Sequence, residues 1–261
     1  DTNTLVSAFQ GRTDIYIFQT RRIMSRIADN TDLNGASSLR VKQDVDVLEL
    51  LTHLDLANKY KVLDNTGSMV FRARESSSFI TRSCCGPRRP FTMYIYDKKK
   101  KPFITLKRPY KCTFMCLWPQ EIQILDATNS NALLGFVKQQ WVFAGRKFVL
   151  YDENETALYT LYGSCIYIEP NCFCKEYTFK IAKCGKEGLD GEGGVKKTWA
   201  GFCRSALDAD NFEVDFPSDI PAEHRALLLG ATFLIDYVYF EEKIEKKAAE
   251  PVEEVAVDGQ V

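Results

Sequence analysis

The sequence predicts a mainly β protein whose antiparallel strands close into a barrel around one apolar helix near the C-terminus. Three observations support this prediction. Runs of alternating apolar residues recur from Tyr60 onward, turn-forming residues separate these runs at regular intervals, and one segment near the C-terminus is apolar on all sides yet too short to cross a bilayer comfortably. Together they indicate about ten to twelve strands that enclose a helix.

The strands are predicted in pairs joined by short turns. The stretch YKVLDNTGSMVFRA has two apolar runs around an Asn-Thr-Gly turn at residues 65–67, which is typical of a hairpin. FTMYIYDKKKKPFITLKR, EIQILDATNSNALLGFVKQQWVF and KFVLYDENETALYTLYG repeat the pattern, and CIYIEP and YTFKIAK add two more runs. Residues 41–55 fit either a helix or a strand. The Gly-rich segment 185–197 lacks the residue order of a phosphate-binding loop, so a flexible loop is expected there.

The apolar segment Ala226–Phe240 predicts the enclosed helix. About fifteen helical residues rise only ~22 Å, whereas the hydrocarbon core of a bilayer is ~30 Å thick. A helix that is apolar all round needs a wall on every side, and a closed barrel provides one. A short or tilted membrane span is the alternative. Asp236 interrupts the segment, and we expect it near the barrel mouth, hydrated or hydrogen-bonded. The apolar side chains assigned to this helix are Leu227, Leu228, Leu229, Phe233, Leu234 and Ile235.

Composition excludes several classes of protein. The formal net charge is -1, so no overall positive field favours a nucleic-acid partner. The nine cysteines lack the spacing of a zinc site and fit reduced thiols in the cytosol. The only histidines, His53 and His224, lie in no recognisable catalytic motif. An enzyme that makes or breaks covalent bonds is therefore not expected.

An acidic stretch, DADNFEVDFPSDI, precedes the apolar helix. Read as a twelve-residue calcium loop, it places carboxylates at the first, third and twelfth positions, while positions five, seven and nine would use backbone carbonyls or water. The glycine expected at the sixth position is replaced by Glu213, so binding would be weak. The alternative is a solvated helix entry capped by Ser218 or Asp219. The candidate calcium ligands are Asp208, Asp210, Phe212, Val214, Phe216 and Asp219.

Longer motifs resemble the phospholipid scramblase family. SCCGPRRPFTMYIYD is similar to the family's Cys-Cys-Gly-Pro-x-Arg-Pro-Phe-Thr segment, and CTFMCLWPQEIQI to its cysteine-rich segment. KKTWAGFCRSALDADNFEVDFPSDI and GATFLIDYVYFE resemble its C-terminal block. The resemblance covers residues 41–242, which we expect to form one barrel domain. Residues 1–40 lie outside it, and the tail 243–261 is expected to be disordered because it has few large apolar residues.

The resemblance implies a tubby-like fold, a twelve-stranded barrel around a central C-terminal helix. It also implies calcium-dependent, ATP-independent movement of phospholipids between leaflets at the cytoplasmic face of the plasma membrane, with the calcium ligands on the acidic loop just described. Family members often carry a palmitoylated cysteine cluster. Here Cys112 and Cys116 are the matching residues, and lipidation and ordinary, partly buried thiols both remain open. A homo-oligomer is a further expectation.

The junction around residues 84–87 is interpreted as a tight turn between strands, with Cys84 and Cys85 packed into the barrel. The neighbouring cations would form a basic patch facing an anionic leaflet if they share one rim. Solvated hairpin tips that protect strand edges are the alternative. A membrane-surface binding module or tether is therefore the second candidate function, beside lipid scrambling. The patch comprises Arg88, Arg89, Lys98, Lys99, Lys100 and Lys101.

Overall fold

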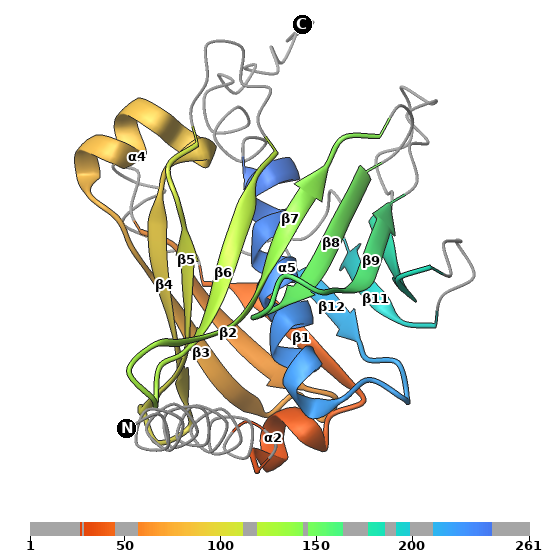
Figure 1. The fold of residues 1–261 in the computed structure, drawn as a ribbon. Helices are drawn as coiled ribbons and strands as arrows, with labels where there is room; N and C mark the ends of the chain where they lie inside the picture. Colours follow the sequence, from red (N-terminus) through yellow and green to blue (C-terminus); the bar gives the residue numbers. More distant parts are fainter. Residues whose placement is uncertain are drawn as a thin grey trace, which may run out of the picture.

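The structure is a computed structural model of the chain, and it describes residues 27, 29–44, 57–111, 119–142, 146–163, 177–185, 192–198 and 211–241. Within these ranges the fold is an antiparallel β-barrel around a helix, with two short helices at its ends (Figure 1). The strands are β1 (Ser38–Gln43), β2 (Lys59–Asp64), β3 (Met69–Ser76), β4 (Phe91–Asp97), β5 (Pro102–Arg108), β6 (Glu121–Asp126), β7 (Ala132–Gln140), β8 (Arg146–Asp152), β9 (Ala157–Gly163), β10 (Tyr177–Lys183), β11 (Gly194–Thr198) and β12 (Asn211–Asp215).

The barrel closes because β1 pairs with both β2 and β12. Every other strand pairs with its neighbours in sequence, and all the pairs are antiparallel. Closure leaves no free strand edge among these strands, which removes the usual template for aggregation. The prediction of a closed antiparallel barrel around a C-terminal helix is confirmed, and the four hairpins read from the sequence are present.

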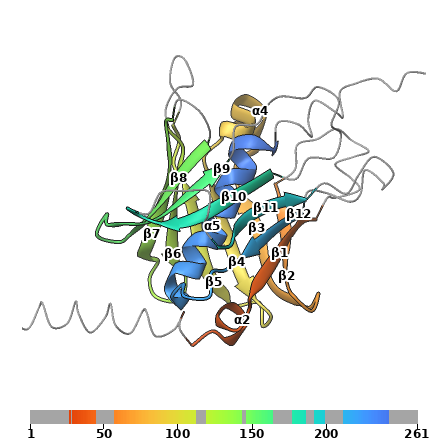
Figure 2. The ribbon, with the colours of Figure 1, turned by 90° about the vertical axis from the view of Figure 1, so that its right-hand side faces the viewer.

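Helix α5 (Ala222–Tyr239) fills the barrel (Figures 1 and 2). It has 18 residues and begins four residues before the predicted segment. Pro221 is its N-cap residue. The predicted helix side chains are all buried, as are Ala226, Ala231 and Tyr237. Asp236 is also buried, with its Oδ2 accepting a hydrogen bond from the Tyr60 hydroxyl at 2.8 Å. The hydrogen-bonded alternative for Asp236 is therefore correct and the hydrated one is wrong.

The described part of the chain contains no helix with both the length and the apolar character that a membrane span needs.

Two local predictions are wrong. The segment 185–197 is not a loop throughout, because residues from Gly194 onward form β11, which is paired on both sides. Gly194 itself takes a φ of 135° and lies against the backbone of Phe179, so a Cβ would come within 2.0 Å of the Phe179 carbonyl oxygen. The Cys84-Cys85 junction is not a turn between strands but helix α4 (Phe79–Cys85), followed by the 3₁₀ helix η1 (Gly86–Arg88). Cys84 is exposed and Cys85 is half-buried, so neither packs into the core.

The two ends of the barrel carry different elements. At the α4 end, β3, β5 and β7 finish while β4, β6 and β8 begin, and helix α5 ends there as well (Figure 1). The opposite end holds helix α2 (Thr31–Asn34) and the turns at residues 65–68, 98–101, 127–131 and 153–156. We call it the α2 end. The Arg225 guanidinium near the start of α5 donates to the carbonyl oxygens of Leu33 and Ala36, which ties the helix to this end.

Gly230 lets α5 approach β6 closely. A Cβ at this position would lie 2.6 Å from Cγ1 of Ile124, a fully buried side chain. The contact leaves no room for a larger residue, because protein interiors are packed at the density of organic crystals.

We therefore expect Gly230→Val to destabilise the protein by about 1–3 kcal/mol through overpacking. Chemical unfolding in urea measures the change. Because Ile124→Ala removes the atom that the new side chain would meet, the double variant should lose less stability than the sum of the two single changes. Additive losses would contradict the close contact.

Candidate functional site

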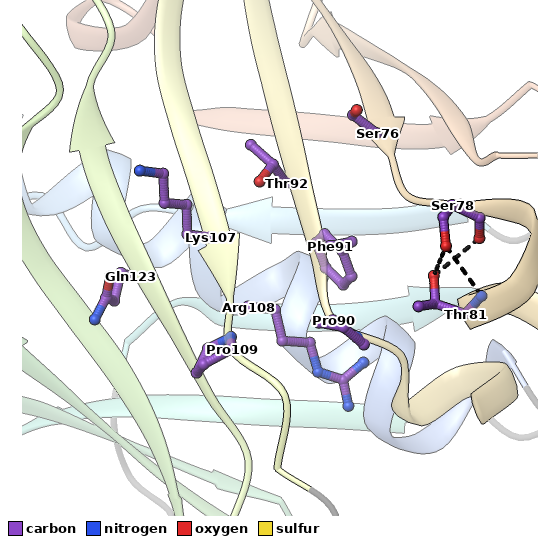
Figure 3. Close-up of a pocket in the computed structure, with 10 residues that line it drawn as sticks. All are labelled: Ser76, Ser78, Thr81, Pro90, Phe91, Thr92, Lys107, Arg108, Pro109 and Gln123. Carbon is purple, nitrogen blue, oxygen red and sulfur yellow. Dashed lines mark hydrogen bonds between the residues drawn. The ribbon is translucent and has the colours of Figure 1, made fainter. Parts of the chain in front are cut away.

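An open pocket of about 480 Å³ lies at the α4 end, between α4 and strands β3–β6 (Figure 3). Figure 3 shows the hydroxyl groups of Ser78 and Thr81 on the helix side and Lys107 and Gln123 on the opposite side. Ser78 is the N-cap of α4, and its hydroxyl oxygen accepts from the Thr81 amide at 3.1 Å. The lining residues are Ser76, Ser78, Thr81, Pro90, Phe91, Thr92, Lys107, Arg108, Pro109 and Gln123.

The lining chemistry suits a polar, negatively charged group. Four hydroxyls, one amide and an exposed ammonium supply hydrogen-bond donors, whereas none of the ten lining residues is an aspartate, glutamate, histidine or cysteine. A lysine ammonium and hydroxyl donors are groups that proteins commonly use to bind phosphate. The described walls of the pocket therefore offer a place to hold an anionic group.

Behind the pocket lies a buried ionic cluster centred on Arg89. Its guanidinium donates to both carboxylate oxygens of Glu75, at 2.6 Å and 2.9 Å, and to Oε1 of Glu241 at 2.6 Å. The side chains of Arg89 and Glu75 are fully buried. Glu75 also accepts from the Tyr237 hydroxyl at 2.8 Å. Because Tyr237 lies in the last turn of α5 and Glu241 directly follows its C-cap, Arg89 fastens this end of the helix to β3 and to the η1 segment.

Two further side chains complete the cluster. The Asn58 side-chain amide donates to the Tyr237 hydroxyl at 3.1 Å and to Oε1 of Glu241 at 2.9 Å. Arg108 connects the cluster to the pocket, since its guanidinium lies 5.7 Å from the centre of the Tyr237 ring while its side chain lines the pocket. Arg108 also donates to the Pro87 carbonyl oxygen. The cluster therefore couples the wall of the pocket to the position of α5.

Burial shifts the pKa values in this cluster. For Glu241, burial is the main cause and raises the pKa to about 8, with the nearby carboxyls of Asp236 and Glu75 adding to the effect against Arg89. Burial also lowers the pKa of Arg108, to about 10. Arg89 is different: burial opposes its charge, but the hydrogen bonds to Glu75 and the acidic groups around it outweigh burial and raise the pKa. Glu241 therefore keeps its proton at neutral pH, while both guanidinium groups stay charged.

The structure does not support the basic patch as one surface. Arg89 is buried, so its assignment to a surface patch is wrong. Arg88 is exposed at the α4 end, before β4 begins, whereas Lys98–Lys101 are exposed beyond the far end of that strand. Seven extended residues separate the two groups, roughly 20 Å at ~3.3 Å per residue. Lys98 is also paired with Asp32 of α2, at 2.7 Å.

The predicted calcium loop does not have the geometry of a single-ion site where the structure describes it. Phe212 and Val214 lie in β12, which is paired with strands on both sides, and their side chains are buried in the barrel, as is that of Phe216. Carbonyl oxygens two residues apart on a strand are separated by roughly 6.6 Å, whereas two ligands of one calcium ion lie at most about 5 Å apart. Phe212 and Val214 therefore cannot both supply carbonyl ligands to one calcium ion.

The remaining predicted ligands divide into two groups. Asp208 and Asp210 lie outside the described residues. Asp219 is exposed, and its carboxylate accepts from the Lys183 ammonium at 2.5 Å. Among the described residues, no group of three or more histidine, cysteine, aspartate or glutamate side chains is arranged to hold a metal ion. The donors present in the described part therefore do not fit a twelve-residue calcium loop.

The predicted lipidation residues, Cys112 and Cys116, also lie outside the described residues. The residues that flank them, Lys111 and Pro119, follow β5 and precede β6, so the chain leaves and rejoins the barrel at the α4 end. Lipidation of these cysteines stays a prediction.

The buried cluster is the feature that sequence reasoning missed. The signal was present in β3, where Phe71, Ala73 and Glu75 alternate on the inward face. A charged residue at an inward strand position is expected only with a partner. Arg89, the second of two adjacent arginines, is that partner, but the adjacency gave no indication of which arginine turns inward.

Comparisons with known proteins identify the family of this chain. The family model described as Scramblase matches residues 21–242. The chain is 36% identical over 207 residues to phospholipid scramblase 1 of Mus musculus, covering 78% of this chain and 61% of that protein. It is 34% identical to phospholipid scramblase 1 of Homo sapiens, over 80% of this chain and 64% of that protein. It is 33% identical to phospholipid scramblase 2 of Homo sapiens, over 80% of this chain and 69% of that protein.

The fold places this protein in the class of closed twelve-stranded antiparallel barrels that enclose a C-terminal helix, here with a polar pocket at one end. The family match extends over most of that barrel, and the chain belongs to the scramblase family. It spans about three fifths of the length of the first relatives, 61% of each of the two rodent proteins. No solved structure gave a significant match.

We expect Arg89→Leu to destabilise the protein by about 3–5 kcal/mol, because it leaves two buried carboxyl groups without their cation. The neighbouring Arg88→Leu is a matched control. Arg88 is exposed, so its replacement should change stability by no more than about 0.5 kcal/mol. Denaturant unfolding of both variants measures the difference, and equal losses would contradict the central position of Arg89.

Glu241 should give the stability a distinct pH dependence. Its pKa is about 8 in the folded protein and near the ordinary 4.5 when unfolded, so the folded state binds the extra proton between these values. Stability should therefore fall as pH rises from about 4.5 to about 8, by an amount of order a few kcal/mol. The reference is Glu241→Gln, which cannot ionise. If wild type and variant melt in parallel across this window, Glu241 does not hold its proton.

Proposed function

We propose that this protein moves phospholipids between the two leaflets of a membrane without ATP, from the cytoplasmic face of the plasma membrane. The observation that carries the proposal is membership of the scramblase family, since the relatives compared above are named phospholipid scramblases. The polar pocket at the α4 end adds support, because a lysine and several hydroxyls can hold a phosphate-bearing headgroup.

The physical problem in lipid scrambling is the headgroup. Burying a polar group in hydrocarbon without a partner costs several kcal/mol, so a catalyst must offer polar partners along the route or thin the bilayer. Helix α5 fills the barrel interior, which leaves the outer surface to do this work. We therefore assign the headgroup contact to the outer wall around Thr92 and Lys107 rather than to α5.

Calcium dependence is part of this proposal and rests on the family resemblance. Because the carbonyls of β12 do not fit a single ion, the acidic residues Asp208 and Asp210 are the candidates left from the predicted loop. No step of lipid movement is assigned to the ion.

The test is lipid exchange in vesicles reconstituted with the full chain. A fluorescent phospholipid in the inner leaflet should become accessible to a membrane-impermeant quencher when calcium is added, and Asp208→Ala should slow this exposure by on the order of tenfold. Glu153→Ala removes the same charge from a hairpin at the α2 end and should leave the rate unchanged. Inactive wild-type protein would contradict the proposed activity, whereas calcium-independent exchange unaffected by Asp208→Ala would contradict only the calcium requirement.

The second candidate function is a membrane-surface module that binds lipid without moving it. Enclosure of α5 in the barrel favours it, since the most apolar helix of the described chain is not available to a bilayer. Vesicle binding by wild type, combined with no lipid exchange in the same preparation, would select this alternative.

A further inference from the structure

Exposed apolar side chains gather at one end of the barrel. Six large apolar residues are exposed in the described part of the chain, and four of them lie at the α4 end: Phe79 (57%), Ile80 (72%), Tyr110 (58%) and Trp141 (64%). Phe79 and Ile80 open α4, while Tyr110 follows β5 and Trp141 follows β7, two strands that finish at this end (Figure 1). The other two, Tyr94 and Leu133, lie in the middle of β4 and near the α2 end.

Helix α4 does not use these side chains for its own folding. It buries no residue, and its side-chain hydrogen bonds are local: Arg82 donates to the Ser77 carbonyl oxygen at 2.7 Å, and Ser78 caps its first turn. Ser78 and Thr81 line the pocket, whereas Phe79 and Ile80 are directed to solvent. A phenylalanine and an isoleucine left in water forgo most of the free energy that their burial would give, so their exposure indicates a partner surface.

The composition of this end matches the interface of a bilayer. Tryptophan and tyrosine are enriched where water meets hydrocarbon, because their rings are apolar and their N–H or O–H groups are polar. Exposed cations accompany them, namely Arg88 beside α4 and Lys107 in the pocket wall, and they complement an anionic leaflet. The α2 end carries the polar hairpin tips instead, including Lys98–Lys101.

We infer that the barrel docks end-on to the bilayer surface through the α4 end, with Phe79, Ile80, Tyr110 and Trp141 in the interfacial layer. The inference rests on the proposed function in taking a phospholipid membrane as the partner, and it adds the surface and the orientation. The pocket beneath α4 then opens at headgroup level, and the chain that carries Cys112 and Cys116 leaves the barrel on the membrane side. Lys98–Lys101 point away from the membrane.

The first test is vesicle flotation of the full chain with phosphatidylcholine–phosphatidylserine vesicles. Phe79→Ser/Ile80→Ser should weaken binding by about tenfold or more, since two apolar side chains leave the interface. The matched control is Tyr94→Ser/Leu133→Ser, which removes the two exposed apolar residues outside the α4 end and should bind like wild type. Equal loss in both variants, or loss in the control alone, would overturn the orientation.

The second test uses Trp141 as a reporter. In a Trp118→Phe/Trp199→Phe background, Trp141 is the only tryptophan, and bromine-labelled phospholipids in the vesicles should quench its fluorescence on binding. Vesicle binding without quenching would place the α4 end away from the membrane and overturn the inference.

Other occupants of this surface give different results. If it is an interface between copies of the chain, Phe79→Ser/Ile80→Ser should convert a dimer to a monomer in sedimentation without changing vesicle binding. If residues 242–261 cover it, their removal should increase vesicle binding. Either result overturns docking by the intact chain. Flotation requires no lipid exchange, so normal binding with absent exchange would count against the proposed activity alone.

Discussion

Enclosure of α5 by the strands is the constraint on which the rest of the structure depends. The helix has an uncharged, mostly apolar middle section, and leaving it in water would forgo the burial of side chains such as Leu228, Phe233 and Leu234, each worth about 1.5–3 kcal/mol. A closed barrel satisfies this helix on every side, and the helix in turn fills an interior that the inward strand residues could not fill alone. The sheet and the helix therefore form one core, as the stacked rings of Phe179 and Tyr239 and the edge-to-face rings of Tyr60 and Phe233 illustrate. Because the interior is occupied, any contact with lipid belongs to the outside of the barrel.

The two ends of α5 are held in different ways. At the α2 end a single arginine, Arg225, reaches backbone carbonyls. At the α4 end the helix meets an ionic cluster in which Arg89 serves two carboxyl groups. A buried ion pair is weak evidence for net stability, since desolvation offsets most of its attraction. Its contribution here is positional: unmet charges inside a protein are costly, so the helix end, β3 and the η1 segment are held together. The same cluster reaches the pocket wall through Arg108, so the surface proposed to meet lipid is supported by the group that anchors the core.

The fold could be predicted largely from the sequence, whereas the candidate site could not. Hairpins such as β2–β3 and β4–β5 can be predicted from the local sequence, because each has two runs of alternating apolar residues with a turn between them. β11 gave no such signal, because it begins at Gly194, directly after another glycine, and its pairing partners β10 and β12 are distinct segments of the chain. Helix α4 was also not predicted from the sequence. Its capping serine is a local signal, but the strong strand patterns on both sides and the Gly-Pro pair favoured a turn. The acidic loop was misread because charge spacing alone does not reveal that Phe212 and Val214 belong to a paired strand.

The sequence by itself determined the antiparallel barrel class, four hairpins, the family and the apolar helix that needs a wall, because each of these follows from short-range periodicity or from long local motifs. Only the tertiary structure decided which of two adjacent arginines is buried, which basic residues share an end of the barrel, and that Phe79, Ile80, Tyr110 and Trp141 gather at one end. The physical reason is that closure of a sheet brings together residues far apart in the chain. Burial, pKa and surface character depend on those neighbours and not on the neighbours in sequence.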